Sequence, residues 1–476
     1  MVYVIIGVLQ RSLAFLILPF VTRVLSPSDY GRVSVVVTTL SLVGVILGAS
    51  LEVPLFRALA RGGTQAERIF RWSRLYLLWL LPSLCIGVAT VLWLLCLRGA
   101  DGFGIWAVEL ASAGLTASLT FYALPVVRAT DRLGLYAGLA LTWMFSLVAG
   151  KLLFLGWLLP GPAGWVTSDL LSGAVAWISV LLLVQPPAIS KATSDPEGSP
   201  ASPWSFAVMC LPLVPHRLAF WGLTSLSRPA LLLVASVKDV GLFSFAANVA
   251  AVSMTLLAEL NRSVLLEYSR EQFPAPSSAT RQIAQTQLMA ALLIPTMVAI
   301  GVTIFGQAIV GSAYYPALRL IALLLVGQVF YGVYLVPMNY LVQSAGLFRW
   351  SSFASVFGAA WILVSVLVAG SLDSLPLVAL GNSGGYLVMA GGAICLVRLA
   401  KLRVNWALLL PPATIALPMT LAFAAATTSL LMFPRLDRWL PLVLALCALV
   451  VVIAMGLTTY GLRGVRQIMP RRARTK

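Results

Sequence analysis

The feature that most constrains this chain is a series of long apolar runs that recurs along its whole length. Each run is about 20 residues, the length that an α-helix needs to cross a hydrocarbon core of about 30 Å. Only helices and closed barrels can cross lipid, and the runs lack the alternation at every second residue that marks barrel strands. The sequence therefore predicts about fourteen spans, near 2–22, 33–56, 75–97, 106–126, 135–158, 165–185, 204–234, 242–263, 285–310, 317–343, 352–370, 376–397, 406–431 and 439–461.

Charge is sparse and strongly one-sided. The chain is 60% hydrophobic and 10% charged, yet its formal net charge is +17. Nucleic acid is a poor explanation for this excess, because basic residues gather in the cytoplasmic loops of polytopic proteins. An even number of spans places both termini on one side, and the basic tail from Arg463 to Lys476 marks that side as cytoplasmic. We expect a multi-pass membrane protein that contacts membrane lipids and binds no nucleic acid.

Several classes of site are missing from the sequence. The five cysteines lie in apolar runs without metal-ligand spacing, so we expect no metal site and no cofactor. The sequence has no HExxH, no P-loop and no sizeable loop with paired carboxylates. We therefore expect a protein that is not an enzyme.

A short internal repeat suggests duplication. Ser26-Pro-Ser-Asp29-Tyr-Gly31 aligns without gaps to Ser236-Val-Lys-Asp239-Val-Gly241, and each copy joins the first and second span of its half. Transporters are commonly built from repeated bundles. We predict an all-α polytopic membrane protein of about 14 helices, with two six-helix bundles in a pseudo-two-fold relation and a terminal helix pair. The expected boundaries are 1–190 for the N-terminal lobe, 191–400 for the C-terminal lobe, and 401–476 for the terminal pair with its basic tail.

The order and spacing of several motifs resemble one family. The opening segment 11–31 (RSLAFLILPFVTRVLSPSDYG) looks like that of bacterial polysaccharide-export flippases, the Wzx-type O-antigen translocases. These belong to the multidrug/oligosaccharidyl-lipid/polysaccharide exporter superfamily. The resemblance covers roughly residues 1–400. Further matches are 128–136 (RATDRLGLY), 240–246 (VGLFSFA), 314–317 (YYPA) and 328–334 (QVFYGVY).

The resemblance implies a substrate and a location. Its members carry a polyprenyl diphosphate with a short glycan across the bacterial inner membrane, for surface polysaccharide such as O-antigen. It also implies that the polysaccharide polymerase machinery is a partner to test. One departure matters: many relatives carry Asp-Arg late in helix 7, whereas this chain has Ser227-Arg228. A role for that acid is therefore in doubt here.

Two arginines are predicted near the middle of the membrane. At 1.5 Å per residue, Arg11 lies about 14 Å and Arg217 about 20 Å along their helices. Cations at that depth are costly unless they face a wet cavity or a partner. A cavity that binds an anion is one interpretation. The other is that each arginine bonds backbone carbonyls freed by nearby prolines such as Pro19 and Pro215.

Helix 7 carries further candidates. Arg217, Trp221, Thr224 and Arg228 lie on one helical face, and would line the cavity with His216. Arg228 is either an anion contact on the release side or an interfacial residue. For His216, proton coupling is open because its charge changes near neutral pH, and a buried, hydrogen-bonded imidazole is the alternative.

The remaining intramembrane charges lie nearer the helix ends. For these we favour pairing or interface roles over coupling to transport. Lys151 and Asp169 are expected to pair, because both fall in the outer halves of helices 5 and 6. The set is Glu52, Glu109, Lys151 and Asp169.

These observations lead to one functional hypothesis. Arg11, Arg217 and Arg228 hold the diphosphate of a lipid-linked oligosaccharide, and alternating access carries it from the inner to the outer leaflet. We expect a monomer. One alternative is a multidrug or small-molecule antiporter of the same superfamily, which would favour cavity acids. The other is a membrane glycosyltransferase or ligase acting on the same lipid.

Overall fold

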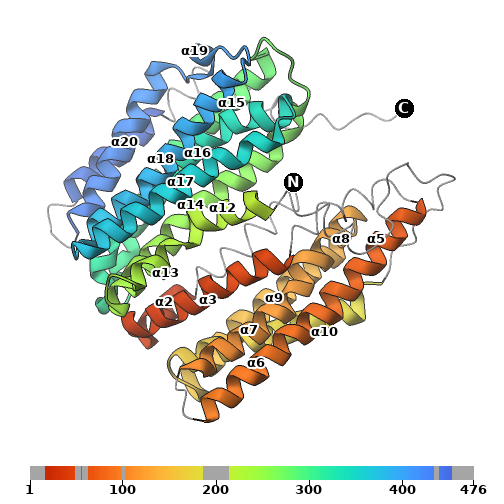
Figure 1. Ribbon diagram of the computed structural model, residues 1–476. Helices are drawn as coiled ribbons and strands as arrows, with labels where there is room; N and C mark the ends of the chain where they lie inside the picture. Colours follow the sequence, from red (N-terminus) through yellow and green to blue (C-terminus); the bar gives the residue numbers. More distant parts are fainter. Residues whose placement is uncertain are drawn as a thin grey trace. The chain divides into compact units, whose positions relative to one another are not determined.

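The computed structural model describes residues 17–48, 55, 63–98, 102–185, 214–433 and 439–452. These residues are almost entirely helical (Figure 1). In this part of the chain, eleven helices are long and apolar enough to cross a membrane, and a shorter apolar helix covers Trp439–Val452. Apart from one isolated bridge between Ala275 and Val404, the described residues contain no β-structure. The predicted all-α polytopic fold is confirmed.

The helices follow the predicted spans in order. The first set is α2 (Leu18–Val24), α3 (Pro27–Gly48), α5 (Gly63–Leu75), α6 (Leu81–Leu97), α7 (Phe103–Ala117), α8 (Leu124–Ala129), α9 (Leu133–Leu153) and α10 (Pro162–Leu183). The second set is α12 (Val214–Ser225), α13 (Ser227–Leu232), α14 (Val237–Ser269), α15 (Ser278–Ile309), η5 (Ser312–Tyr314), α16 (Tyr315–Asn339), α17 (Phe348–Ser371), α18 (Leu375–Leu399), α19 (Trp406–Leu409) and α20 (Ala413–Leu431).

Wider π-helical turns interrupt four of the spans. They are η1 (Tyr76–Leu80), η2 (Ser118–Ala123), η3 (Phe154–Leu158) and η6 (Tyr340–Ser344). The helix after η1 has Pro82 in its first turn, and proline cannot donate to the carbonyl four residues before it, that of Leu78. The indole N–H of Trp177 on α10 donates to that carbonyl at 2.9 Å. The Trp177 side chain thus supplies the hydrogen bond that Pro82 cannot donate to the Leu78 carbonyl.

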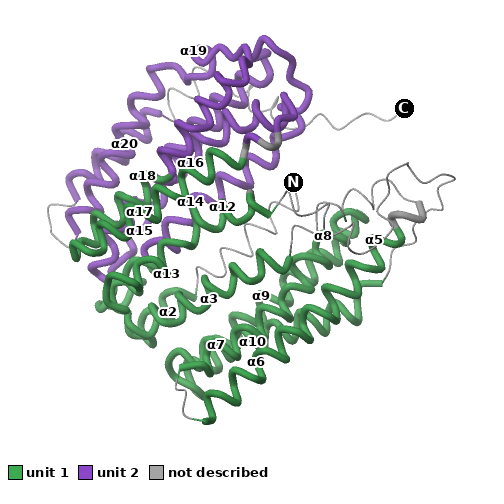
Figure 2. The backbone as a smooth tube through the Cα atoms, in the orientation of Figure 1, with its two compact units in different colours: residues 1–245, 309–314, 352–385 green, residues 246–308, 315–351, 386–476 purple. Residues whose placement is uncertain are grey.

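The chain divides into two compact units (Figure 2). The first unit contains residues 1–245, 309–314 and 352–385, and the second contains 246–308, 315–351 and 386–476. The lobe boundaries expected from the sequence, at 190 and 400, stay a prediction.

Small residues set the helix packing of the first unit. Within it, α7 packs against α3, α6 and α10, and α10 also packs against α9. A Cβ added to Gly114 of α7 would overlap the side chain of Cys85, and one on Gly173 of α10 would approach the carbonyl of Ser112 to 3.0 Å. Close helix contacts of this kind stabilise bundles in lipid, where apolar burial alone gives little driving force between helices.

The second unit is built around α15, α16 and α20. A Cβ on Gly332 of α16 would overlap Ala291 of α15, so these two helices also touch through small residues. α16 packs against α20, and the Arg319 side chain donates to the carbonyl of Phe433 at 2.6 Å. At one end of the unit, Tyr268 and Tyr340 pack edge-to-face with ring centroids 5.1 Å apart.

Candidate functional site

The two copies of the sequence repeat adopt the same local structure. Ser26 is the residue before α3, its hydroxyl donates to Asp29 at 2.7 Å, and the Asp29 N–H donates back to it at 3.1 Å. Ser236 and Asp239 make the same two bonds before α14, at 2.5 and 3.2 Å. Each pair satisfies orphan groups at the start of a helix and places a carboxylate at its positive end. The repeat is thus a pair of matching helix caps.

The two capped helices also touch each other through the glycines of the repeat. A Cβ on Gly31 would overlap the carbonyl oxygen of Val237, and one on Gly241 would overlap that of Pro27. Each glycine therefore faces the residue four positions before the other glycine. The contact is symmetric between the copies, and it admits no side chain at either position because the obstructing atoms belong to backbone. We call it the glycine crossing.

Aromatic side chains surround the glycine crossing. Tyr30 makes edge contacts with Trp165, Phe245 and Tyr314, with ring centroids 5.8, 6.4 and 6.0 Å away. The Tyr314 hydroxyl donates to the carbonyl of Leu25 at 3.1 Å, which ties η5 to the end of α2. This cluster joins the N-terminal helices, α10 and the start of α14 within the first unit.

The face of α12 that carries the candidate residues meets α3. The Trp221 indole donates to the Thr38 carbonyl at 3.1 Å and to the Ser41 hydroxyl at 3.0 Å. Thr224 donates to the carbonyls of its own helix at Phe220 and Trp221. Trp221 is therefore a packing contact between α12 and α3, and its role in lining a cavity stays a prediction.

Other residues of the same segment meet α17 and α18. A Cβ on Gly222 would come within 2.9 Å of Ala359 on α17. The Asn382 amide of α18 donates to the Ser227 hydroxyl at 2.6 Å, at the first residue of α13. Helix 7 is thus contacted on both sides of Leu226, the residue between α12 and α13, whose backbone dihedrals remain helical.

The structure describes only some of the residues predicted to line the cationic site. Arg217 is half-buried in α12 and Arg228 is 8% exposed in α13, and each contacts neighbouring groups. Arg11 and Glu52 lie outside the described residues, as does the side chain of His216. The anion-binding role of the arginines is therefore untested and stays a prediction.

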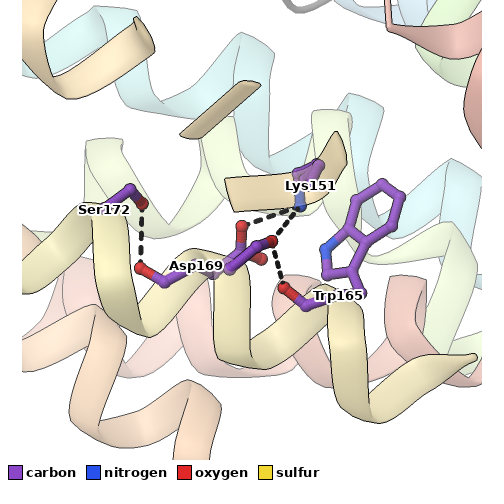
Figure 3. A network of polar contacts seen from close by, with 5 residues as sticks. Lys151, Trp165, Asp169 and Ser172 are labelled. Carbon is purple, nitrogen blue, oxygen red and sulfur yellow. Dashed lines mark hydrogen bonds and ion pairs between the residues drawn. The ribbon is translucent and has the colours of Figure 1, made fainter. Parts of the chain in front are cut away.

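Three other predicted charges lie in the first unit, on the mutually packed helices α7, α10 and α9, and Figure 3 shows two of them, Lys151 and Asp169. The Lys151 ammonium on α9 donates to Asp169 on α10 at 2.8 Å and to Ser168 at 3.4 Å. It also lies 3.5 Å from the centre of the Trp165 ring, a cation–π contact. Glu109 on α7 is 7% exposed and interacts electrostatically with both Lys151 and Asp169. We call Glu109, Lys151 and Asp169 the charged cluster.

Sequence reasoning paired Lys151 with Asp169 and included Glu109 among the candidate charges, but it did not place Trp165 or Glu109 beside that pair. Trp165 lies four residues before Asp169, so helical spacing alone could have placed both on one face of α10. The sequence predicts only that Glu109 lies near a helix end, and no local pattern links it to α9 or α10. In the described part of the chain, no group of three His, Cys, Asp or Glu residues gathers as a metal site.

Comparisons with known proteins support the architecture. No protein-family model and no curated protein matches the sequence. Several solved structures match over most of their length. "Lipid II flippase MurJ, inward closed conformation" has a TM-score of 0.53 at 12% identity, covering 96% of both chains. An inward-facing MATE family multidrug resistance transporter of the MOP superfamily has 0.55 at 15%, covering 83% of this chain and 98% of its own.

The MATE multidrug transporter DinF-BH gives a TM-score of 0.56 at 14% identity, covering 84% of this chain and 93% of its own. Identities this low show the fold alone. The chain has the fold of MOP superfamily transporters. These neighbours are a flippase and transporters, so the choice between those activities depends on chemistry that the fold does not fix.

Proposed function

We propose that the chain is a flippase that moves polyprenyl-diphosphate-linked oligosaccharide across the bacterial inner membrane, with both termini in the cytoplasm. The observation that carries the proposal is the combination of a flippase-type fold with two basic residues, Arg217 and Arg228, on the segment that α12 and α13 form. The resemblance of segment 11–31 to Wzx-type flippases supplies the glycan as cargo.

The chemistry of the arginines suits a diphosphate. A diphosphate diester bears about two negative charges, and guanidinium groups bind phosphate oxygens through paired, charge-assisted hydrogen bonds. In this scheme Arg11 and Arg217 hold the diphosphate and Arg228 receives it nearer the outer leaflet, while the prenyl tail stays in lipid.

Transport can then draw on the membrane potential. An inside-negative potential of 100 mV favours outward movement of an anion by about 2.3 kcal/mol per charge, hence about 4–5 kcal/mol for a diphosphate. In the proposed cycle, the helices separate and rejoin at the glycine crossing, which is a contact between the two repeat copies.

Exchange of the arginines tests the proposal. Arg217→Gln and Arg11→Gln are each introduced into cells that lack the natural copy, and surface polysaccharide is measured at matched protein levels. Loss of a charged hydrogen-bond donor predicts a decrease of about 10- to 100-fold in export. Arg98→Gln, at an exposed arginine that ends α6, is the matched control and leaves export unchanged.

Two further measurements test whether export needs only the positive charge of Arg217 or also its hydrogen-bond geometry, and whether the protein exports drugs instead. Arg217→Lys retains part of the export if charge alone is needed, and little if paired hydrogen bonds are needed. The likeness to two multidrug transporters favours drug export as the second candidate. Normal polysaccharide in both Gln variants, together with loss of resistance to cationic drugs, contradicts the flippase assignment in favour of that rival.

A further inference from the structure

The charged cluster of the first unit is buried but not neutral. Glu109 is 7% exposed and Lys151 is 4% exposed, and the Asp169 side chain is 15% exposed. The three residues come from α7, α9 and α10, which pack in the order α7–α10–α9. Two carboxylates and one ammonium leave a net charge of −1 inside a membrane-spanning bundle. An uncompensated charge in such a place is costly.

The two acids have unequal partners. Asp169 accepts the 2.8 Å hydrogen bond from Lys151 (Figure 3). The buried Oε2 of Glu109, by contrast, has no hydrogen-bond partner among the described residues. A buried carboxylate whose oxygen accepts no hydrogen bond from the protein is the less stable of the two anions, and it is the one that a proton would stabilise most.

Few other charges lie on the described helices that pack around the cluster: α8, which packs on α9, carries Arg128, and α2, which packs on η3, carries Arg23. Glu109, Lys151 and Asp169 are the only charged residues of α7, α9 and α10, respectively, and α6, which packs on α7, contains none. α3, which packs on α7 and α10, carries Asp29 and Arg32 in its first two turns. Asp29 is engaged with Ser26 and the side chain of Arg32 is exposed.

We propose that the charged cluster is a binding site for one proton, held on the carboxylate of Glu109. A proton from water forms an O–H bond on Glu109, which brings the cluster to neutrality with Lys151 and Asp169 as a buried ion pair. No electron is transferred and no other bond changes. A sodium ion could balance the charge instead, but beside the Lys151 ammonium it meets repulsion, and it needs several oxygen ligands.

The position of the site gives the proton a function. The Trp165 ring touches both the Lys151 ammonium and the ring of Tyr30, at the glycine crossing. When Glu109 loses its proton, Lys151 is attracted by two carboxylates rather than one, and its contact with Trp165 weakens. Proton occupancy thereby biases the packing around the crossing and couples flipping to protons. This second part rests on the proposed flippase function.

Infrared difference spectroscopy of the purified full-length protein in lipid tests the site without any substrate. The wild type shows the carbonyl stretch of a protonated carboxylic acid at neutral pH, which shifts in heavy water. Glu109→Gln removes that band. The matched control is Glu259→Gln, because Glu259 is also 7% exposed but is paired with Arg262 at 2.5 Å; it leaves the band in place.

A second variant keeps Glu109 in place, so that loss of the band cannot be attributed to misfolding caused by replacing Glu109. Asp169→Asn removes one acid and brings the cluster to neutrality without a proton, so Glu109 ionises and the band disappears although Glu109 is present. A wild type without the band at neutral pH overturns the site. So does a band that survives Glu109→Gln, that persists in Asp169→Asn, or that sodium removes at constant pH.

The coupling is tested separately in vesicles that contain polyprenyl-diphosphate-linked glycan. Glu109→Gln flattens the pH profile of flipping relative to Glu259→Gln, whereas an unchanged pH profile overturns the coupling. If the wild type flips no glycan at all, the proposed function fails while the infrared result still decides the proton site.

Discussion

The two compact units bury polar groups in different ways. In the second unit, Asn261 accepts hydrogen bonds from Gln287 at 2.8 Å and from Asn339 at 2.7 Å, and Tyr268 donates to Gln287 at 2.7 Å. This network is neutral. The charged cluster of the first unit instead holds an ion pair and a further acid whose Oε2 lacks a hydrogen-bond partner within the described structure.

This difference distinguishes buried polar groups that hold the fold together from buried polar groups that can change their charge. A neutral, hydrogen-bonded network fixes one arrangement of helices and gains nothing from a change in protonation. The buried acid of the second unit, Glu259, also has its cation beside it in Arg262. An unbalanced cluster has two charge states of different stability, which is what a switch requires. We therefore expect the second unit to act as scaffold at these positions and the first unit to respond to protons.

The largest expected effect is loss of the buried ammonium. Lys151→Met leaves Asp169 without its cation, and breaking a buried pair by removing one partner costs about 3–5 kcal/mol. Arg270→Met is the control in the second unit, because the side chains of Arg270 and Glu267 are 66% and 45% exposed and their pair is worth about 0–1 kcal/mol. Thermal unfolding in detergent measures both. Equal losses in the two variants would remove the contrast between the units.

The second largest effect is expected from a larger side chain at the glycine crossing. Gly241→Ala places a Cβ against the carbonyl of Pro27, and overpacking of this kind costs about 1–3 kcal/mol. Gly301→Ala, in α15 of the second unit, meets open space and should stabilise the helix by about 0.5–1 kcal/mol. The same unfolding assay compares them. If both alanines stabilise the protein, the crossing is not a close backbone contact.

The neutral network allows a matching test in the second unit. Asn261→Leu leaves the amide donors of Gln287 and Asn339 without their acceptor, at a cost of about 1–3 kcal/mol. The stability loss should be the same at every pH between 5 and 8, because none of these groups ionises there. A loss that varies with pH over that range would show that this network, too, responds to protons.

The smallest effect sharpens the comparison within the first unit. Trp177→Phe removes the donor to the Leu78 carbonyl that Pro82 leaves unpaired, at about 1 kcal/mol. In the Pro82→Ala variant, the backbone N–H of residue 82 can donate to the Leu78 carbonyl. Trp177→Phe should therefore lower the free energy of unfolding less in that variant than in the wild type. A double-mutant cycle measures the coupling. Additive effects would mean that Trp177 does not substitute for the missing backbone donor.

The fold was largely predictable because long apolar runs leave few structural options in lipid. Helix ends were harder to predict. The apolar run near 242–263 predicts a span that stops short of the observed end of α14 at Ser269. The helix continues through polar sequence that carries pairs three residues apart, Glu259 with Arg262 and Glu267 with Arg270, and hydropathy does not register these pairs.

The candidate site was less predictable, because its contacts join distant segments. The repeat was visible in the sequence, but nothing in an alignment shows that Gly31 and Gly241 touch. Similarly, Glu109 reaches Lys151 and Asp169 only through the packing of α7 on α10, and no local spacing encodes that contact. Depth along a helix predicts where a charge lies in the membrane, but not which neighbour it meets.

Reconstituted flipping measures the central claim most directly. Purified protein is placed in vesicles with polyprenyl-diphosphate-linked glycan in both leaflets, and the glycan exposed outside is followed over time by an impermeant reagent. With the wild type, we predict that the reagent rapidly consumes the glycan of both leaflets, because the protein moves inner-leaflet glycan outward. With Arg217→Gln, or with an uncharged lipid that bears the same glycan, the reagent should consume little more than the outer-leaflet glycan. Equal rates for the charged and the uncharged lipid would contradict the claim that this protein carries its cargo by an anionic group.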